Sequence, residues 1–242
     1  MQDPAKRNAL SSGMLDGLTA AFGTFEARDV RAVVLRAQAE DRVWCAGFDI
    51  NELAPDIDPL AQDGPLQALF RCVAECRAPV IAMLHGSAWG GGTDLALRCD
   101  IAVADPTASL AFTPARLGLP YDPDGLLYVL LRAGLHVAME MFSTADPVPA
   151  ERAMALRLVN HVVPEAELEA FTFALAGRIA ANAPLSVASA KQQLRALAQA
   201  MPLPSALAQR LQEGRRRALR SDDYRDGLAA FHARRTPVFR GQ

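Results

Sequence analysis

Two glycine-containing turns hold the residues of this sequence that are best placed to do chemistry. The first is CAGFDI at residues 45–50, and the second is GSAWGGGTD at residues 86–94. Each turn follows an apolar stretch and precedes a helical pattern, so its backbone N–H groups have no partner in the first helical turn. Two such turns side by side would point two N–H donors at one negatively charged oxygen. Alternatively, the glycines only permit tight turns.

Metal binding is not expected from the cysteines and histidines. Cys72 and Cys76 lie four residues apart on one face of a helical pattern, but no second Cys/His pair follows at ligand spacing. We therefore expect these thiols, together with Cys45 and Cys99, to be reduced and buried. The histidines are isolated from one another: His85, His136, His161 and His232.

The sequence around the two turns resembles the crotonase (enoyl-CoA hydratase/isomerase) superfamily. The matching segments are AGFDI (46–50), HGSAWGGGTDLAL (85–97), CDIAVAD (99–105), LVNHVV (158–163) and SDDYRDGLAAFHARRTPVF (221–239), which together extend over nearly the whole chain. Members of that superfamily bind acyl-CoA thioesters and stabilise a thioester enolate between two backbone N–H groups. By position, the resemblance implies that these donors are the N–H groups of Phe48 and Gly91.

Carboxylates decide which reaction follows the enolate. Hydratases of the superfamily place two glutamates around a water molecule. Here the first of these positions is Asp94, one methylene shorter, and the second is Ala115, which can neither give nor take a proton. Ordinary hydration is therefore disfavoured, and Asp94 is either a catalytic group or a structural partner of the helix start.

One branch of the superfamily matches better. The segments AFTPARLGLPY (111–121), EMFSTADP (140–147) and RLQEGRRR (210–217) resemble methylmalonyl-CoA decarboxylases, which lack the second glutamate and carry a tyrosine at the position of Tyr121. The resemblance implies decarboxylation of methylmalonyl-CoA or a related malonyl-type CoA, with the Tyr121 hydroxyl orienting the departing carboxylate. Enoyl-CoA hydration or isomerisation is the alternative, and Tyr121 is alternatively a packed aromatic residue. That branch has histidine where this chain has Phe48, which changes the acyl pocket but keeps the backbone donor.

The resemblance also implies which residues contact the substrate. They lie in the two turns or in segments beside them: Arg7, Ala9, Leu10, Ala46, Asp49, Ile50, Trp89, Gly90, Pro114 and Leu117. Phe231 and Arg234 resemble positions that contact CoA from a neighbouring subunit, where an arginine suits phosphate groups. For Arg7 and Arg234 the alternative is a solvated surface charge. No metal or redox cofactor is implied, because the CoA thioester is the substrate. Family members form trimers or dimers of trimers.

Alternating apolar strands and helical patterns in the first half predict an α/β fold with a mainly parallel, buried sheet. Strands are predicted at residues 31–35, 43–45, 80–84, 101–104 and 109–112, and helices at 8–25, 65–76 and 90–98. Residues 54–64 predict a mobile surface loop, and the chain after Gly125 is predicted to be helical except at 159–163. The resemblance implies a crotonase-like ββα spiral core over residues 1–180 and a C-terminal helical trimerisation part over residues 181–242.

Composition argues against several classes of protein. Hydrophobic residues make up 51% and charged residues 21%, which argues against disorder, and the net charge of −2 argues against a nucleic-acid binder. RNA binding through the basic run at residues 215–217 remains an alternative, although acidic residues flank it. A non-catalytic acyl-CoA-binding protein is another. No apolar run of membrane-spanning length and no signal-peptide pattern are expected, so we predict a soluble, cytoplasmic protein.

Overall fold

The computed structural model describes residues 1–38, 42–53, 58–61, 63–198 and 205–240. It contains two four-stranded sheets, ordered β1-β3-β5-β8 and β2-β4-β6-β7. The strands of the first sheet are β1 (Val33–Arg36), β3 (Val80–Leu84), β5 (Ile101–Ala104) and β8 (His161–Val162). The strands of the second are β2 (Val43–Cys45), β4 (Ser87–Trp89), β6 (Ser109–Ala111) and β7 (Val148–Pro149).

The chain follows a spiral path that passes from one sheet to the other. Each turn adds one strand to the first sheet, one to the second, and then a helix: α2 (Pro65–Glu75) after β2, α3 (Gly91–Arg98) after β4, and α4 (Pro123–Thr144) after β6. The first sheet is parallel throughout, and the second is parallel except for its β6–β7 pair. The predicted α/β fold with ββα turns is confirmed. The strand β7 was missed because a two-residue strand containing a proline carries almost no pattern.

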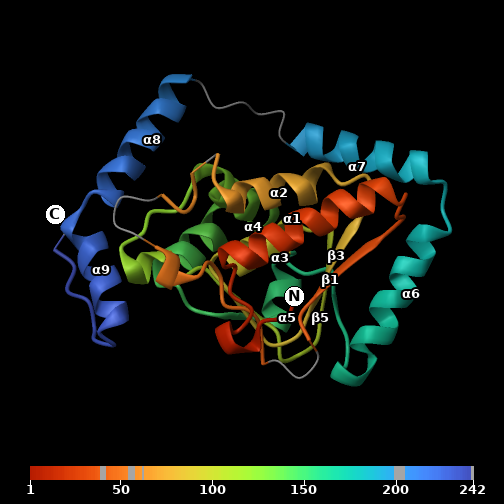
Figure 1. The fold of residues 1–242 in the computed structure, drawn as a ribbon, viewed down its shortest axis with the longest axis horizontal. Coiled ribbons are helices and arrows are strands. Elements are labelled where there is room, and N and C mark those ends of the chain that lie inside the picture. The colour runs from red at the N-terminus through yellow and green to blue at the C-terminus, as the bar shows by residue number, and fades with distance from the viewer. Residues whose placement is uncertain (39–41, 54–57, 62, 199–204, 241–242) are drawn as a thin grey trace.

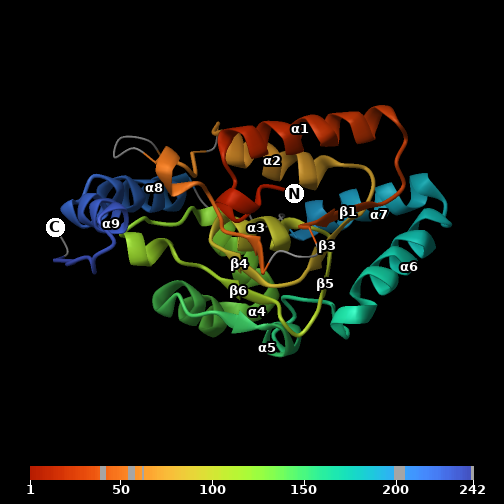
Figure 2. The same ribbon diagram turned by 60° about the horizontal axis from the view of Figure 1, so that its bottom comes forward.

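The remaining helices surround this spiral, as Figures 1 and 2 show. In Figure 2, α1 and α2 lie on one side of the strands, and α4 and α5 on the other. α6 and α7 stand at one end of the molecule, and α8 and α9 at the opposite end (Figure 1). Their bounds are α1 (Ser12–Ala27), α5 (Ala150–Ala155), α6 (Leu168–Ala180), α7 (Pro184–Ala198), α8 (Ser205–Leu219) and α9 (Asp222–His232), with 3₁₀ turns η1 (Pro4–Lys6), η2 (Ile50–Glu52), η3 (Pro114–Leu117) and η4 (Glu165–Glu167).

The core is formed where α1, α2 and α3 pack on the strands. Trp44, Phe70 and Phe112 are among its largest fully buried side chains. All four cysteines are free; three of them are buried, whereas Cys72 is only half-buried. Burying apolar side chains contributes roughly 1.5–3 kcal/mol each, so these residues dominate the stability of the spiral.

The helix α4 is the longest of the described helices, and it corrects one prediction. By length and composition alone, its 22 residues are apolar enough to cross a membrane, whereas the sequence analysis expected no such segment. Gly134 has a φ of +81° and breaks the helix into two parts. Apolar side chains remain exposed along its outer face: Leu126, Leu130, Leu131, Leu135 and Met139.

Contacts from α7 and α9 hold helices beyond residue 180 against the spiral. On α7, the Lys191 ammonium donates to the carbonyls of Val73 and Ala78 and pairs with Asp100 at 2.7 Å. On α9, Gly227 lies so close to η3 that a Cβ there would collide with the Leu117 carbonyl. α9 of the same chain therefore covers η3, directly beside the two glycine turns.

Candidate active site

The two glycine turns lie against each other. Gly47 has a φ of +88°, and a Cβ on it would lie 2.5 Å from the Trp89 carbonyl oxygen. Gly92 packs against Cys45 in the same way, with its Cβ position 2.7 Å from the sulfur. Only glycine permits this approach of one backbone to the other. Burial raises the pKa of the Cys45 thiol to about 12, so this buried cysteine stays protonated.

The backbones of Phe48 and Gly91 lie close to each other at this contact. Leu10 donates to the Gly47 carbonyl at 2.7 Å and accepts from Asp49 at 3.4 Å, so the Phe48 N–H points away from Leu10. The Cβ position of Gly91 is 3.5 Å from the Phe48 nitrogen. Within the described ranges, neither N–H donates a backbone hydrogen bond. Such a pair can stabilise a negatively charged oxygen.

Asp94 lies one helical turn beyond Gly91 and is fully buried. Its Oδ1 accepts from Arg98 Nε at 2.9 Å, and its Oδ2 accepts from the Tyr121 hydroxyl at 3.0 Å. The Arg98 guanidinium lies between the rings of Phe70 and Tyr128, 4.1 and 4.5 Å from their centroids. Asp94 thus forms an ion pair with Arg98 and accepts a hydrogen bond from the Tyr121 hydroxyl.

Tyr121 lies in an aromatic cluster with Phe112 and Phe142, each with its ring centroid 5.2 Å away. Burial first, and then the negative charge of Asp94, raise the pKa of Tyr121 well above its ordinary value. The hydroxyl therefore keeps its proton and acts as a hydrogen-bond donor. Tyr121 is therefore both a packed aromatic ring and a polar group of the site.

Asp122 is a second buried carboxyl group at this site, and it was not predicted from the sequence. Its Oδ1 caps α4 by accepting from Asp124 N at 3.0 Å and Gly125 N at 3.1 Å, whereas its buried Oδ2 has no hydrogen-bond partner among the described residues. Burial, and then the charge of Asp94, raise the pKa of Asp122 to about 6. The Asp-Pro pair at the start of an apolar helix signalled a cap, but not a buried acid.

Several predicted substrate-contacting residues gather around the two turns. Ala9 and Leu10 are buried, and the Ala46 N–H donates to the Arg7 carbonyl at 3.1 Å. The Arg7 side chain is exposed, and its backbone is left-handed, with φ of +52°. Ile50 lies at the end of the first turn, and Trp89 and Gly90 lie within the second. In η3, Pro114 is buried and Leu117 packs on α9.

Asp49 is a special case among these residues. It is 4% exposed, accepts from Lys6 Nζ at 2.8 Å, and caps η2 through Asn51 N. Burial acts to raise its pKa, but hydrogen bonds from Lys6 and Asn51 outweigh burial and lower the pKa below the ordinary value. Asp49 therefore stays ionised and fixes the end of the first turn. Lys6 had not been singled out in the sequence.

Phe231 and Arg234 are not brought to the two turns by the contacts of this single chain. Both are exposed at the C-terminal end of α9, where Phe231 is 44% exposed and Arg234 is left-handed with φ of +51°. The part of α9 that packs on η3 lies earlier, at Tyr224, Gly227 and Leu228. Their predicted contact with CoA from a neighbouring subunit stays a prediction.

The basic run at residues 215–217 is not a continuous exposed patch. Arg215 is buried and forms a two-pronged ion pair with Asp58. Asp58 and the buried Leu60 belong to the segment predicted to be a surface loop, so its described part packs against α8 instead. The predictions for residues 54–57 and 62 lie outside the described residues. Losing Arg215 from the run weakens the RNA-binding alternative.

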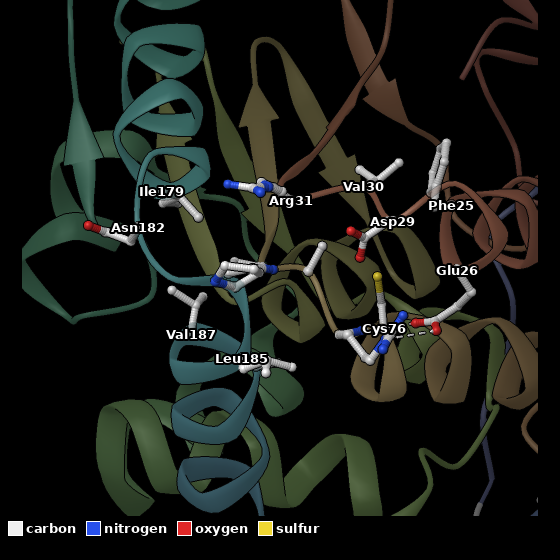
Figure 3. Close-up of a pocket in the computed structure, with 15 residues that line it drawn as sticks. Phe25, Glu26, Asp29, Val30, Arg31, Cys76, Ile179, Asn182, Leu185 and Val187 are labelled. Atoms are coloured by element: carbon white, nitrogen blue, oxygen red, sulfur yellow. Dashed lines mark hydrogen bonds and ion pairs between the residues drawn. The ribbon is translucent and has the colours of Figure 1, made fainter.

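Two hollows in the molecule are distinct from the glycine turns. One, of about 230 Å³, lies between the end of α1, the start of β1 and the α6–α7 corner (Figure 3). None of the predicted site residues lines it. The other, of about 1270 Å³, lies beneath α4 and α7 and is lined by Arg98, which pairs with Asp94, and by Tyr128.

Comparisons with known proteins show to which family this chain belongs. The family model described as enoyl-CoA hydratase/isomerase matches residues 1–242. The chain is 38% identical to methylmalonyl-CoA decarboxylase of Escherichia coli K12 over 237 residues, which covers 98% of this chain and 91% of that protein. It is 32% identical to 2,3-dehydroadipyl-CoA hydratase of the same organism, over 99% of this chain and 92% of that protein. The chain belongs to the enoyl-CoA hydratase/isomerase family.

Solved structures of related proteins have the same fold as this chain. A methylmalonyl-CoA decarboxylase in complex with 2-nitronate-propionyl-CoA matches with a TM-score of 0.95 at 38% identity, covering 98% of this chain and 92% of that one. An enoyl-CoA hydratase from Mycobacterium avium subsp. paratuberculosis matches with a TM-score of 0.82 at 27% identity, covering 99% and 93%. The protein is therefore a crotonase-superfamily enzyme with the predicted ββα fold.

Proposed function

We propose that this enzyme decarboxylates methylmalonyl-CoA or a related malonyl-type CoA thioester. The observation that carries the proposal is the Tyr121 hydroxyl on Asp94, one helical turn from the Gly91 N–H. The similarity to methylmalonyl-CoA decarboxylase, in sequence and in fold, supports it. One solved relative is described as a complex with 2S-carboxypropyl CoA, a thioester-like ligand that carries a carboxylate.

The proposed reaction needs an electron sink more than a base. The bond from the α-carbon to the carboxylate breaks, carbon dioxide leaves, and the electron pair moves into the thioester to give an enolate. The N–H groups of Phe48 and Gly91 would hold the enolate oxygen, which accounts for their geometry. The α-carbon then takes up one proton. The CoA thioester itself is the electron sink, so we propose no metal or redox cofactor.

Side chains around the turns would hold the rest of the substrate. The thioester would lie between Phe48 and Gly91, and the acyl group against Trp89 and Leu117. CoA would run along the segment from Arg7 to Leu10 and along Ala46, Asp49 and Ile50. Tyr121 would turn its hydroxyl from Asp94 toward the carboxylate that leaves, because one hydroxyl has one proton to donate. Gly90 and Pro114 would leave room for the ligand beside these groups.

Hydration or isomerisation of an enoyl-CoA is the alternative reaction for this family. Ala115 is exposed on η3 and carries no ionisable group at the position that should hold the second acid. General acid–base help is worth about 10²–10⁴-fold in rate. We expect crotonyl-CoA to be hydrated slower than by an ordinary hydratase by that factor, measured as loss of the enoyl absorbance.

The deciding experiment compares three substrates with the purified enzyme. Methylmalonyl-CoA and malonyl-CoA should release carbon dioxide and yield propionyl-CoA and acetyl-CoA, while crotonyl-CoA should react slowly or not at all. Fast hydration of crotonyl-CoA without decarboxylation would refute the proposal and leave only the family. Binding of all three thioesters without turnover would identify a non-catalytic acyl-CoA-binding protein instead.

We also propose that the working enzyme is a trimer or a dimer of trimers. The exposed apolar side chains on α4, among them Leu131 at 50% and Leu135 at 62% exposed, support an interface between copies. In such an assembly, Phe231 and Arg234 of one subunit would contact CoA bound to the next. Light scattering after size-exclusion chromatography would show about three or six times the monomer mass.

A further inference from the structure

The two buried carboxyl groups of the site meet at a single glycine. Gly125 donates its N–H to Asp122 Oδ1 at 3.1 Å, and a Cβ on Gly125 would lie 3.0 Å from Asp94 Oδ2. The same Cβ would collide with the Tyr121 ring. Only a glycine there lets the N-terminus of α4 close on Asp94, so Asp122, Gly125 and Tyr121 form one wall around that carboxylate.

Asp122 has an unused hydrogen-bonding atom inside this wall. Its side chain is 5% exposed, and its Oδ2 has no partner among the described residues. The cap uses only Oδ1, which accepts from Asp124 N and Gly125 N. A carboxylate oxygen buried without a donor is unfavourable, whereas a protonated carboxyl group has an O–H to offer to a neighbouring anion.

Among the described residues, three charged groups act most strongly on Asp122. Asp94 and Arg98 belong to α3, and Asp124, whose side chain is exposed, belongs to α4 itself. Tyr121, the residue before it, is neutral. Burial and the charge of Asp94 outweigh the Gly125 hydrogen bond and the charge of Arg98, and the pKa of Asp122 is raised to about 6. Asp122 is therefore protonated in a larger fraction of molecules than an ordinary aspartate at the same pH.

We propose that Asp122 supplies the proton that ends on the α-carbon after carbon dioxide has left, and that Asp94 and Tyr121 pass it on. This inference rests on the proposed decarboxylation. As the Tyr121 hydroxyl proton moves to carbon, Asp94 takes the Asp122 proton and passes it to the Tyr121 oxygen. The net change is one proton from Asp122 to carbon, and the enolate electron pair forms the new C–H bond. Asp122 then takes a proton from solvent.

Asp122 does not contact the reacting carbon in this scheme, so it is a positioning residue that acts through Asp94 and Tyr121. It fills the place in the reaction that Ala115 leaves empty, since this chain has no ionisable group there. The hollow that Arg98 lines brings solvent to within one side chain of the cluster, and solvent there can replace the proton.

The variant Asp122→Asn tests this role without removing the helix cap, because an asparagine oxygen accepts the same two N–H bonds. Asp124→Asn is the matched control: it removes a carboxylate two residues away that is exposed. Two readouts are used with methylmalonyl-CoA: the pH profile of kcat, and the configuration at C2 of the monodeuterated propionyl-CoA formed in D₂O.

The wild type and Asp124→Asn should lose about eightfold in kcat between pH 6.5 and 7.5, as the acid form is depleted, and should deliver deuterium to one face. Asp122→Asn should lack this decline and give a racemic product from protonation by water. Loss of either feature in Asp122→Asn alone supports the proposal. If Asp122→Asn matches the wild type in both readouts, Asp122 is only a cap. If the wild type releases no carbon dioxide, the proposed function fails, and this inference fails with it.

Discussion

The N-termini of α3 and α4 converge on Asp94, and they contribute to the site in opposite ways. The start of α3 acts through its backbone: Gly90, Gly91 and Gly92 carry no side chains, and the Gly91 N–H donates no backbone hydrogen bond among the described residues. The start of α4 acts through side chains: Tyr121 donates to Asp94, and Asp122 caps the helix with one oxygen while the other has no hydrogen-bond partner in the described part of the chain. One terminus fixes where a charge can form, and the other controls a proton. Changing each terminus separately should therefore separate these two tasks.

The largest effect is expected from removing a backbone donor at α3. Gly91→Pro deletes the N–H at the first helical position, where proline is compatible with helix geometry. Loss of one such donor costs about 2.7–4 kcal/mol of barrier, or roughly 10²–10³-fold in kcat. CoA affinity, measured by titration calorimetry, should stay within about threefold because the contacts to CoA lie elsewhere.

Gly91→Ala is the control for this change. It keeps the N–H and adds a methyl group that would lie 3.5 Å from the Phe48 nitrogen and 3.6 Å from Leu10 Cδ1, both ordinary contacts. It should therefore retain much more activity than Gly91→Pro. Equal losses in the two variants would mean that the space at Gly91, and not its N–H, is what turnover requires.

The two termini also differ in how far they could be predicted. The α3 start could be predicted from the sequence because the requirement for glycine is local. A Cβ on Gly47 or Gly92 would collide with the neighbouring turn, and Gly90 has a φ of +49°, which favours glycine. Strands β3 and β5 were predicted at their observed bounds because fully buried strands are continuous apolar runs.

The α4 start was predicted only in part, because its chemistry arises from distant packing. Tyr121 was chosen from a family resemblance, but its hydrogen bond to Asp94 depends on how α4 lies on α3. The pKa of Asp122 is raised only because the fold buries this carboxyl group and brings the charge of Asp94 near it. Arg215 was assigned to an exposed run, whereas its partner Asp58 lies 157 residues away. Nothing in the local sequence indicates such pairs.

A smaller effect is expected from Tyr121→Phe, which removes one hydroxyl at α4. A hydrogen bond to a charged group contributes about 1.5–3 kcal/mol, so kcat for decarboxylation should fall roughly 10–150-fold. Because the hydroxyl also satisfies buried Asp94, the free energy of unfolding should fall by about 1–3 kcal/mol. Stopped-flow release of carbon dioxide and urea unfolding measure the two effects.

Tyr128→Phe is the matched control on the same helix. It keeps the ring over Arg98 and removes only a hydroxyl that accepts from Arg195 at 3.3 Å. Both kcat and stability should stay near the wild-type values. If Tyr121→Phe behaves like Tyr128→Phe, the Tyr121 ring serves packing alone and the α4 terminus has no part in proton transfer.

The smallest effect concerns stability, and it isolates Asp122 from catalysis. Its pKa is raised to about 6 in the folded protein, against about 3.9 in an unfolded chain. Between these two pH values the folded state therefore binds more protons than the unfolded state. The stability due to the protonated carboxyl group is lost as pH rises through 6. Between pH 5 and 8 the wild type should lose about 1–2 kcal/mol of unfolding free energy through this group. The free energy of unfolding of Asp122→Asn should fall by that much less, because asparagine cannot ionise. Plots of unfolding free energy against pH, obtained from urea unfolding, should therefore diverge between the two proteins as pH rises. Curves that stay parallel from pH 5 to 8 would show that Asp122 titrates as an ordinary surface acid, and the α4 terminus would then hold no proton for the site.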